Sequence, residues 1–252
     1  MQVSIVPEVI TNILGIPVTN TLIASLITTI VLVTISYFAT RQLKEVPKGL
    51  QNLFEFVIEA LFGMVDSVTK DKKQTQQFFP LVATIFIFVI ISNWIGLLPG
   101  FGSVGFFEIP EEGLHEEGAI FVPLLRSTNS DLNTTMALAI VAVISIQIFG
   151  IMALGVFKYA KKFINFSSPI TFFVGILELI SEVAKMISFS FRLFGNVFAG
   201  EVLLVVIMTL APFIAPIPFF AIELFVGFIQ ALVFSMLTLV FLKTATMAHE
   251  EH

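Results

Sequence analysis

Five long apolar segments, separated by stretches that are more polar, basic or rich in proline, dominate the sequence. They cover residues 21–39, 78–98, 132–157, 169–210 and 219–243. A helix needs roughly 20 consecutive apolar residues to cross the hydrocarbon core of a bilayer. We therefore expect an all-α integral membrane protein with about five membrane-crossing helices, which form a single membrane domain over residues 1–252.

Residues 49–66 show a different periodicity. Their polar side chains recur at helical spacing, and these are Gln51, Asn52, Glu55, Glu59 and Asp66. That spacing gives a single polar stripe on an otherwise apolar helix. We predict one interfacial amphipathic helix, which lies along the membrane surface instead of crossing it.

The fourth apolar segment is unusually long. Ser168 and Pro169 are typical of a helix start, and no proline follows before Leu210. A continuous helix of this length would measure about 60 Å, twice the thickness of a hydrocarbon core of about 30 Å, so it must tilt steeply. A proline cluster at 212–218 marks a turn. We therefore expect the last two helices to form a long, strongly tilted hairpin.

Basic residues predict the orientation. The loop at 99–131 is rich in Gly, Pro and Glu, and we expect it to be irregular, with Ser130 or Asp131 capping the next helix. Of 13 Lys and Arg residues, only Arg126 lies in this loop. Because basic loops stay in the cytoplasm, we expect the N-terminus and this loop outside and the C-terminus in the cytoplasm. A multi-pass protein of the cell inner (plasma) membrane is the first hypothesis, and an organelle is the alternative.

Composition narrows the function class. Hydrophobic residues make up 57% of the chain and charged residues 12%, whereas soluble domains carry about 25% charged residues. The net charge of -5 gives no sign of nucleic-acid binding. The chain has no cysteine, and its three histidines lack the spacing of a metal site. We expect no metal and no cofactor.

The segment 169–210 holds the ionisable residues that indicate function. At 100° per residue, one stripe about 80° wide contains all members of a polar set, namely Glu178, Glu182, Lys185, Arg192 and Asn196. Glu201 falls roughly opposite Arg192. In the last segment, Glu223 and Gln230 are seven residues apart and share a face.

Depth in the membrane separates these residues again. With the predicted orientation, Glu178 and Glu182 lie toward the inner side, Glu201 and Glu223 toward the outer side, and Arg192 between them. Acidic groups thus approach from both sides and stop short of a fixed positive charge. A guanidinium is effectively never deprotonated, so it can separate two half-channels without joining a proton relay.

Several of these residues also have a plainer interpretation. Glu178, Glu182 and Lys185 would also fit a solvated, mutually paired stripe near the inner interface. Glu223 near a helix start would also complement the helix dipole, and Gln230 would fit an interhelical hydrogen bond. Arg192 is hardest to explain this way, because it is too deep to reach the interface easily.

Several motifs resemble a known family. The run Ser190-Phe-Arg192-Leu-Phe-Gly195-Asn196, continued by Ala199-Gly200-Glu201, closely resembles the signature of subunit a of F-type ATP synthase. Asn93-Trp-Ile-Gly-Leu-Leu-Pro99 is similar to the end of the family's second span. Arg126 with Asp131-Leu-Asn133-Thr134-Thr135 is similar to the start of its third. Gln230 to Thr238 resembles its last helix.

The resemblance implies partners and roles. The chain would be the stationary, non-catalytic ion-translocating subunit, placed against a ring of c subunits, with peripheral-stalk b subunits, the rest of the complex and membrane lipid as further partners. Arg192 matches the family's essential arginine, and Gln230 a glutamine that faces it. Glu201 and Glu223 match the outer half-channel pair, where many relatives carry one histidine. Asn196 matches a residue near the outer path, and Glu178 one that lines the inner path, with Glu182 beside it.

Two other functions are compatible with buried charges. A stand-alone secondary transporter would use Arg192 as a substrate counter-ion, but such folds usually show repeated halves, and the sequence has none. A structural membrane scaffold would tolerate loss of its buried charges. The sequence leaves the choice between protons and sodium ions open.

Overall fold

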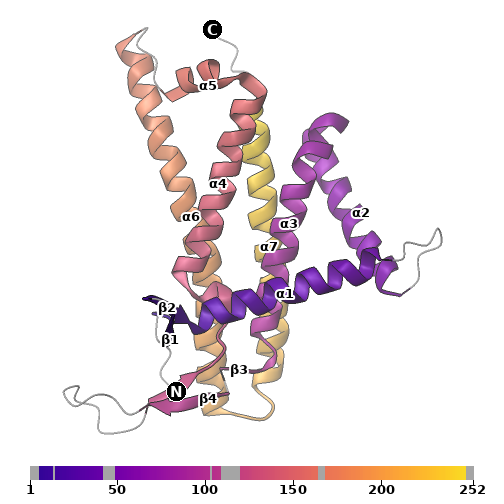
Figure 1. Cartoon of the computed structure of the whole chain (residues 1–252), viewed down its shortest axis with the longest axis vertical. Coiled ribbons are helices and arrows are strands. Elements are labelled where there is room, and N and C mark those ends of the chain that lie inside the picture. Colours follow the sequence, from indigo (N-terminus) through magenta and orange to yellow (C-terminus); the bar gives the residue numbers. More distant parts are fainter. Residues whose placement is uncertain are drawn as a thin grey trace. The chain divides into compact units, whose positions relative to one another are not determined.

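The computed structural model describes residues 6–13, 15–41, 49–102, 104–108, 120–163 and 168–247. Within these residues the secondary structure is predominantly helical (Figure 1). Five helices are long and apolar enough to cross a membrane, and these are α1 (Asn20–Thr40), α3 (Lys72–Gly96), α4 (Leu132–Leu154), α6 (Pro169–Leu210) and α7 (Pro216–Thr246). The predicted all-α membrane class with five spans is confirmed.

The ends of the helices follow the apolar segments to different degrees. The bounds of α1 agree with the prediction within one residue at each end, and those of α6 agree fully. Helix α3 instead begins at Lys72, because residues 72–77 are polar but include Lys and Gln, which are good helix formers. Helix α7 begins at Pro216, a residue type that the first turn tolerates.

The third span is shorter than predicted. Helix α4 ends at Leu154 instead of residue 157, and Gly155 takes a φ of +83°, a conformation that favours glycine. A separate short helix, α5 (Val156–Phe163), follows at once. Apolarity alone did not reveal this break, because Val156 and Phe157 continue the hydrophobic run.

Side chains cap the helix starts that were predicted. The Ser168 hydroxyl accepts a hydrogen bond from the Ile170 amide at 3.3 Å, at the start of α6. Of the two candidate caps for α4, Asp131 accepts from the Asn133 amide at 2.9 Å. Helix α6 then runs for 42 residues without interruption. Its steep tilt in the membrane stays a prediction.

The amphipathic helix is present as α2 (Leu50–Thr69), three residues longer at its C-terminal end than predicted. Leu61 and Val65 are buried, whereas Leu53 and Phe56 are exposed. The helix thus keeps apolar side chains on a face that the chain itself does not cover, which fits the expected place at the membrane surface.

Two antiparallel hairpins were not predicted. Strands β1 (Val9–Ile13) and β2 (Ile16–Thr19) form the first. The second lies inside the loop 99–131 that we expected to be irregular: β4 (Gly105–Glu108) pairs with β5 (Ile120–Pro123). The loop also contains β3 (Pro99–Gly102) and the 3-10 helix η1 (Thr128–Ser130). The strands are only four or five residues long, too short for a clear alternating pattern.

The chain divides into two compact units. The first comprises Met1–Arg41, Ile87–Thr134 and Leu193–Ala231, and the second comprises Gln42–Phe86, Thr135–Arg192 and Leu232–His252. Helices α3, α4, α6 and α7 each continue from one unit into the other. The expected single membrane domain stays a prediction.

The two units differ in what they bury. The first buries many polar side chains, among them Asn20, Thr21, Asn93, Arg126, Thr128, Asn129, Ser130 and Asp131. The second is built around an apolar cluster of Val65, Phe78, Val82, Ile146, Tyr159, Leu239, Leu242 and Ala245. Many polar groups in the first unit bond to one another, as Thr21 does to Asp131 and Asn129 to Asn93, because lipid offers them no hydrogen bonds.

We expect Gly150→Val to destabilise the protein. A Cβ atom at position 150 would overlap the ring of the buried Tyr159, so the variant must displace α5 or distort α4. Overpacking of this kind costs about 1–3 kcal/mol. Thermal denaturation of the detergent-solubilised protein should show a lower Tm. Gly63→Val in α2 is the control, because open space surrounds position 63, and equal Tm values for both variants would contradict the prediction.

Candidate functional site

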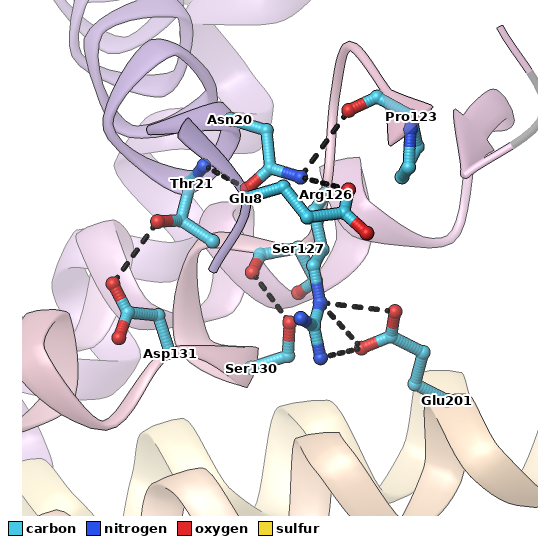
Figure 2. A network of polar contacts seen from close by, with 9 residues as sticks. All are labelled: Glu8, Asn20, Thr21, Pro123, Arg126, Ser127, Ser130, Asp131 and Glu201. Atoms are coloured by element: carbon cyan, nitrogen blue, oxygen red, sulfur yellow. Dashed lines mark hydrogen bonds and ion pairs between the residues drawn. The ribbon is translucent and has the colours of Figure 1, made fainter. Parts of the chain in front are cut away.

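In the first unit, Arg126 and Glu201 form an ion pair. The Nε atom of Arg126 lies 3.2 Å from Oε1 of Glu201, and Nε and Nη2 both donate to Oε2 at 3.4 Å. The side chain of Arg126 is 5% exposed and that of Glu201 is 28% exposed. The guanidinium also lies 5.9 Å from the ring centre of Phe198, one turn before Glu201 on α6. Figure 2 shows the two charged groups directed at one another.

The segment that carries Arg126 is fixed on both sides (Figure 2). Before it, Asn20 of α1 donates to the Pro123 carbonyl at 3.2 Å. After it, Ser130 donates through its hydroxyl to the Ser127 carbonyl at 2.9 Å. The Thr21 hydroxyl then donates to Asp131 at 3.0 Å, which joins the start of α1 to the start of α4. Hydrogen bonds on both sides therefore hold the loop segment that carries the Arg126 guanidinium.

Glu223 lies against the residue before Glu201. Gly200 has no side chain, and a Cβ atom there would overlap the carboxyl group of Glu223. The absence of that atom lets the Glu223 carboxyl rest on the backbone of α6. The two predicted outer residues therefore lie close together. Glu201 belongs to α6, and Glu223 of α7 contacts the residue before it, Gly200.

The end of α3 holds this part of α7. Asn93 donates to the Gly227 carbonyl at 3.0 Å, and the Trp94 indole donates to the Leu224 carbonyl at 3.1 Å. Asn93 in turn accepts from Asn129 at 2.7 Å. The Asn93-Trp94 pair, identified by resemblance, therefore positions the segment of α7 that carries Glu223.

The helix-dipole interpretation of Glu223 is not supported. Helix α7 begins at Pro216, three residues earlier than predicted, and its first turn contains no acidic residue. The influence of a helix terminus falls off within its first turn. Glu223 stands seven residues beyond Pro216, so its place needs another explanation.

In the second unit, the predicted inner acids are paired. Glu182 accepts from Lys185 at 2.8 Å and from Gln147 of α4 at 2.9 Å. Glu178 forms an ion pair of 2.7 Å with Lys162 of α5. The pairing of Glu182 with Lys185 fits the plainer interpretation of this stripe. The ion pair of Glu178 does not fit it, because its partner Lys162 belongs to α5 and not to α6.

Tyr159 of α5 joins this inner network. Its hydroxyl donates to the side-chain oxygen of Gln147 at 2.5 Å, and the side-chain nitrogen of Gln147 donates to Glu182. Burial, followed by the negative charges of Glu182 and Glu178, raises the pKa of the Tyr159 hydroxyl to about 12. The phenol therefore stays protonated, and remains a donor, to a higher pH than an ordinary tyrosine does.

Arg192 belongs to the second unit, as do Glu178 and Glu182, whereas Asn196, Glu201, Glu223 and Gln230 belong to the first. Arg192 is half-buried near the middle of α6, and its Nη2 donates to the Ser188 hydroxyl at 3.3 Å. Asn196 and Gln230 are also half-buried. The expected approach of Gln230 to Arg192 stays a prediction.

Among the residues of these networks that were not predicted as site residues are Arg126, Gln147 and Tyr159. Arg126 had a usable signal, since it is the one basic residue in the loop 99–131. Gln147 and Tyr159 had none, because their roles depend on how α4 and α5 pack against α6. In the described part of the chain, no cluster of three His, Asp or Glu residues is placed to bind a metal ion.

Comparison with known proteins decides the family. A family model described as ATP synthase A chain matches residues 22–243. ATP synthase subunit a of Campylobacter jejuni strain 81-176 is 34% identical over 226 residues, which cover 88% of each chain. That of Gloeobacter violaceus is 35% identical over 233 residues, 92% of this chain and 86% of the relative.

A third relative, ATP synthase subunit a 3 of Pelobacter propionicus, is 37% identical over 215 residues, 84% of this chain and 81% of its own length. The chain belongs to the ATP synthase subunit a family. It is thus a multi-pass membrane protein that functions within the ATP synthase complex. The resemblance seen in the sequence motifs is confirmed.

We expect Gly200→Ala to slow ion conduction through the membrane sector. The added methyl group would displace the Glu223 carboxyl from α6. A displacement of a reacting group by about 1 Å can slow its reaction by about a hundredfold, and we expect a similar effect on ion transfer at Glu223. Passive ion flux into vesicles stripped of the catalytic head measures the effect. Gly63→Ala, in open space on α2, should conduct like the unchanged protein, and normal flux in Gly200→Ala would contradict the expectation.

We expect Tyr159→Phe to change how stability depends on pH. The neutral phenol is favoured in the folded state, so its contribution is fully present below the ordinary pKa of 10.0 and is lost as the pH rises toward about 12. Between about pH 9 and about pH 12, the free energy of unfolding should therefore fall less steeply with pH for Tyr159→Phe than for the unchanged protein. Tyr37→Phe is the control, because Tyr37 is exposed. Parallel curves for all three proteins would refute the role of Tyr159.

Proposed function

We propose that this chain is the stationary ion-translocating subunit of the membrane sector and provides two offset aqueous half-channels to carboxylates on the c-subunit ring. Arg192 separates the half-channels. Glu201, Glu223 and Asn196 belong to the outer path and Glu178 and Glu182 to the inner path, while Gln230 faces the arginine. Ion flow through them drives rotation and ATP synthesis.

One observation carries this proposal. Along the single uninterrupted helix α6, acidic residues stand on both sides of Arg192: Glu178 and Glu182 precede it, and Glu201 follows it. A charge at the bilayer centre costs on the order of 3 kcal/mol, so a guanidinium between two acidic approaches requires a functional reason.

The mechanism follows from the chemistry of these groups. An ion enters from outside past Glu201 and Glu223 and neutralises a ring carboxylate, which can then turn into lipid. After nearly a full circle, the carboxylate meets the inner path and releases its ion. The guanidinium attracts the ionised carboxylate but cannot take up or release a proton, so it prevents direct leakage between the two paths.

Partners and location complete the proposal. Phosphate chemistry belongs to the peripheral head of the complex, and this chain is non-catalytic. The c-subunit ring and the peripheral-stalk b subunits are its direct neighbours. We place it in the cell inner membrane with its N-terminus outside and its C-terminus in the cytoplasm. Family membership favours this function over a stand-alone transporter or a scaffold.

We expect Arg192→Ala to abolish ATP synthesis while the complex still assembles. Loss of the guanidinium removes both the attraction for the ring carboxylate and the barrier between the half-channels. Synthesis driven by an imposed ion gradient in vesicles, and ATP-driven pumping, measure the two losses. Arg41→Ala is the control, because Arg41 is an exposed cation at the end of α1. Retained pumping in Arg192→Ala would refute the assigned role.

A further inference from the structure

The two outer carboxyl groups have the same chemistry but different surroundings. Glu201 is bonded through both carboxylate oxygens to Arg126. Glu223 forms no ion pair with any residue in the described parts of the chain and packs on the bare backbone of Gly200. Identical side chains are therefore placed in one ion-paired and one uncompensated position.

The backbone that carries Arg126 is held in place, so Arg126 has little freedom to follow Glu201 if that carboxylate moves. The carbonyl of Leu125 accepts from the Gly102 amide at 2.9 Å, and the amide of Leu124 donates to the Val104 carbonyl at 2.9 Å. With the contacts of Pro123 and Ser127 described above, hydrogen bonds hold the backbone before and after Arg126. The Arg126 side chain is 5% exposed, so bulk water has little access to replace a lost partner.

A buried arginine depends on the charge of its partner. Neutralising Glu201 would leave the guanidinium as an uncompensated buried charge, which is strongly destabilising. Arginine itself does not release its proton. The ion pair therefore favours a Glu201 carboxylate that stays bound to Arg126, a poor property for a group that must load and unload an ion at every step.

We propose that Arg126 is a positioning residue that holds Glu201 as a fixed anion, so that Glu223 is the outer carboxyl group that takes up and passes on the translocated ion. This inference rests on the proposed outer half-channel and divides the work of its two acids. Glu201 then shapes the path and its electrostatic field. Glu223, which lies beside it across Gly200, exchanges the ion.

The test uses Gln substitutions in the intact ATP synthase. Either single change at the pair, Arg126→Gln or Glu201→Gln, leaves one charge unpaired and should lower passive conduction of the coupling ion by about tenfold or more. The double variant Arg126→Gln/Glu201→Gln removes both charges together. It should regain at least about a third of normal conduction, because a neutral pair leaves no uncompensated charge.

Glu223 should behave differently. Glu223→Gln should lower conduction by about a hundredfold, since it removes a group that transfers the ion. The double variant Arg126→Gln/Glu223→Gln should conduct no better than Glu223→Gln. It is therefore the matched control for the rescue expected in Arg126→Gln/Glu201→Gln. Arg126→Lys, which keeps the charge but loses the planar bidentate geometry of the guanidinium, should retain more conduction than Arg126→Gln.

The results separate this inference from the proposed function. Flux of protons and of sodium ions into vesicles stripped of the catalytic head, with immunoblots for assembly, gives the readout. A double Gln variant at the pair that assembles but stays as inactive as Glu201→Gln would show that Glu201 itself carries the ion, and would overturn the inference. Failure of that variant to assemble would overturn it too, because a Gln pair keeps hydrogen bonds for positioning. Normal conduction in every Gln variant, together with retained ATP-driven pumping in Arg192→Ala, would instead refute the proposed function.

Discussion

The structure depends on the pairing of the acidic side chains that the long apolar helix α6 carries. An uncompensated charge in the hydrocarbon core costs on the order of 3 kcal/mol or more. In the described residues, three ion pairs meet this constraint: Arg126 with Glu201, Lys162 with Glu178, and Lys185 with Glu182. Two of the three join α6 to a different element, so charge pairing also determines which loop and which short helix are held against it.

Each compact unit meets this constraint with its own network. In the first unit, the hydrogen bonds from Asn20, Thr21 and Asn93 fix the loop and the helix starts around Arg126 and Glu223. In the second, Tyr159 and Gln147 extend the pairing of Glu182. Both networks are made from short-range contacts between segments distant in sequence. They fix the acids on either side of Arg192 in different ways.

Much of the fold could be predicted because lipid imposes a simple rule. Apolar length located the five spans, and the absence of proline after Pro169 predicted the uninterrupted α6. The break at Gly155 was missed because apolarity continues past it. The short hairpin of β4 and β5 was missed because its strands are too short to show a period, and its polar surroundings resemble an irregular loop.

The candidate site was predictable only in part, for a physical reason. A sequence motif identifies Glu201 and Glu223 as acids but says nothing of their neighbours, and neighbours decide whether a carboxyl group is fixed or able to exchange an ion. Arg126 lies 75 residues from Glu201 in the chain, and Gly200 acts through an atom that it lacks. Neither effect is visible as helical spacing. An outer path with two identical acids can therefore still contain two different functions, because one acid is held by a cation that cannot lose its charge and the other is not.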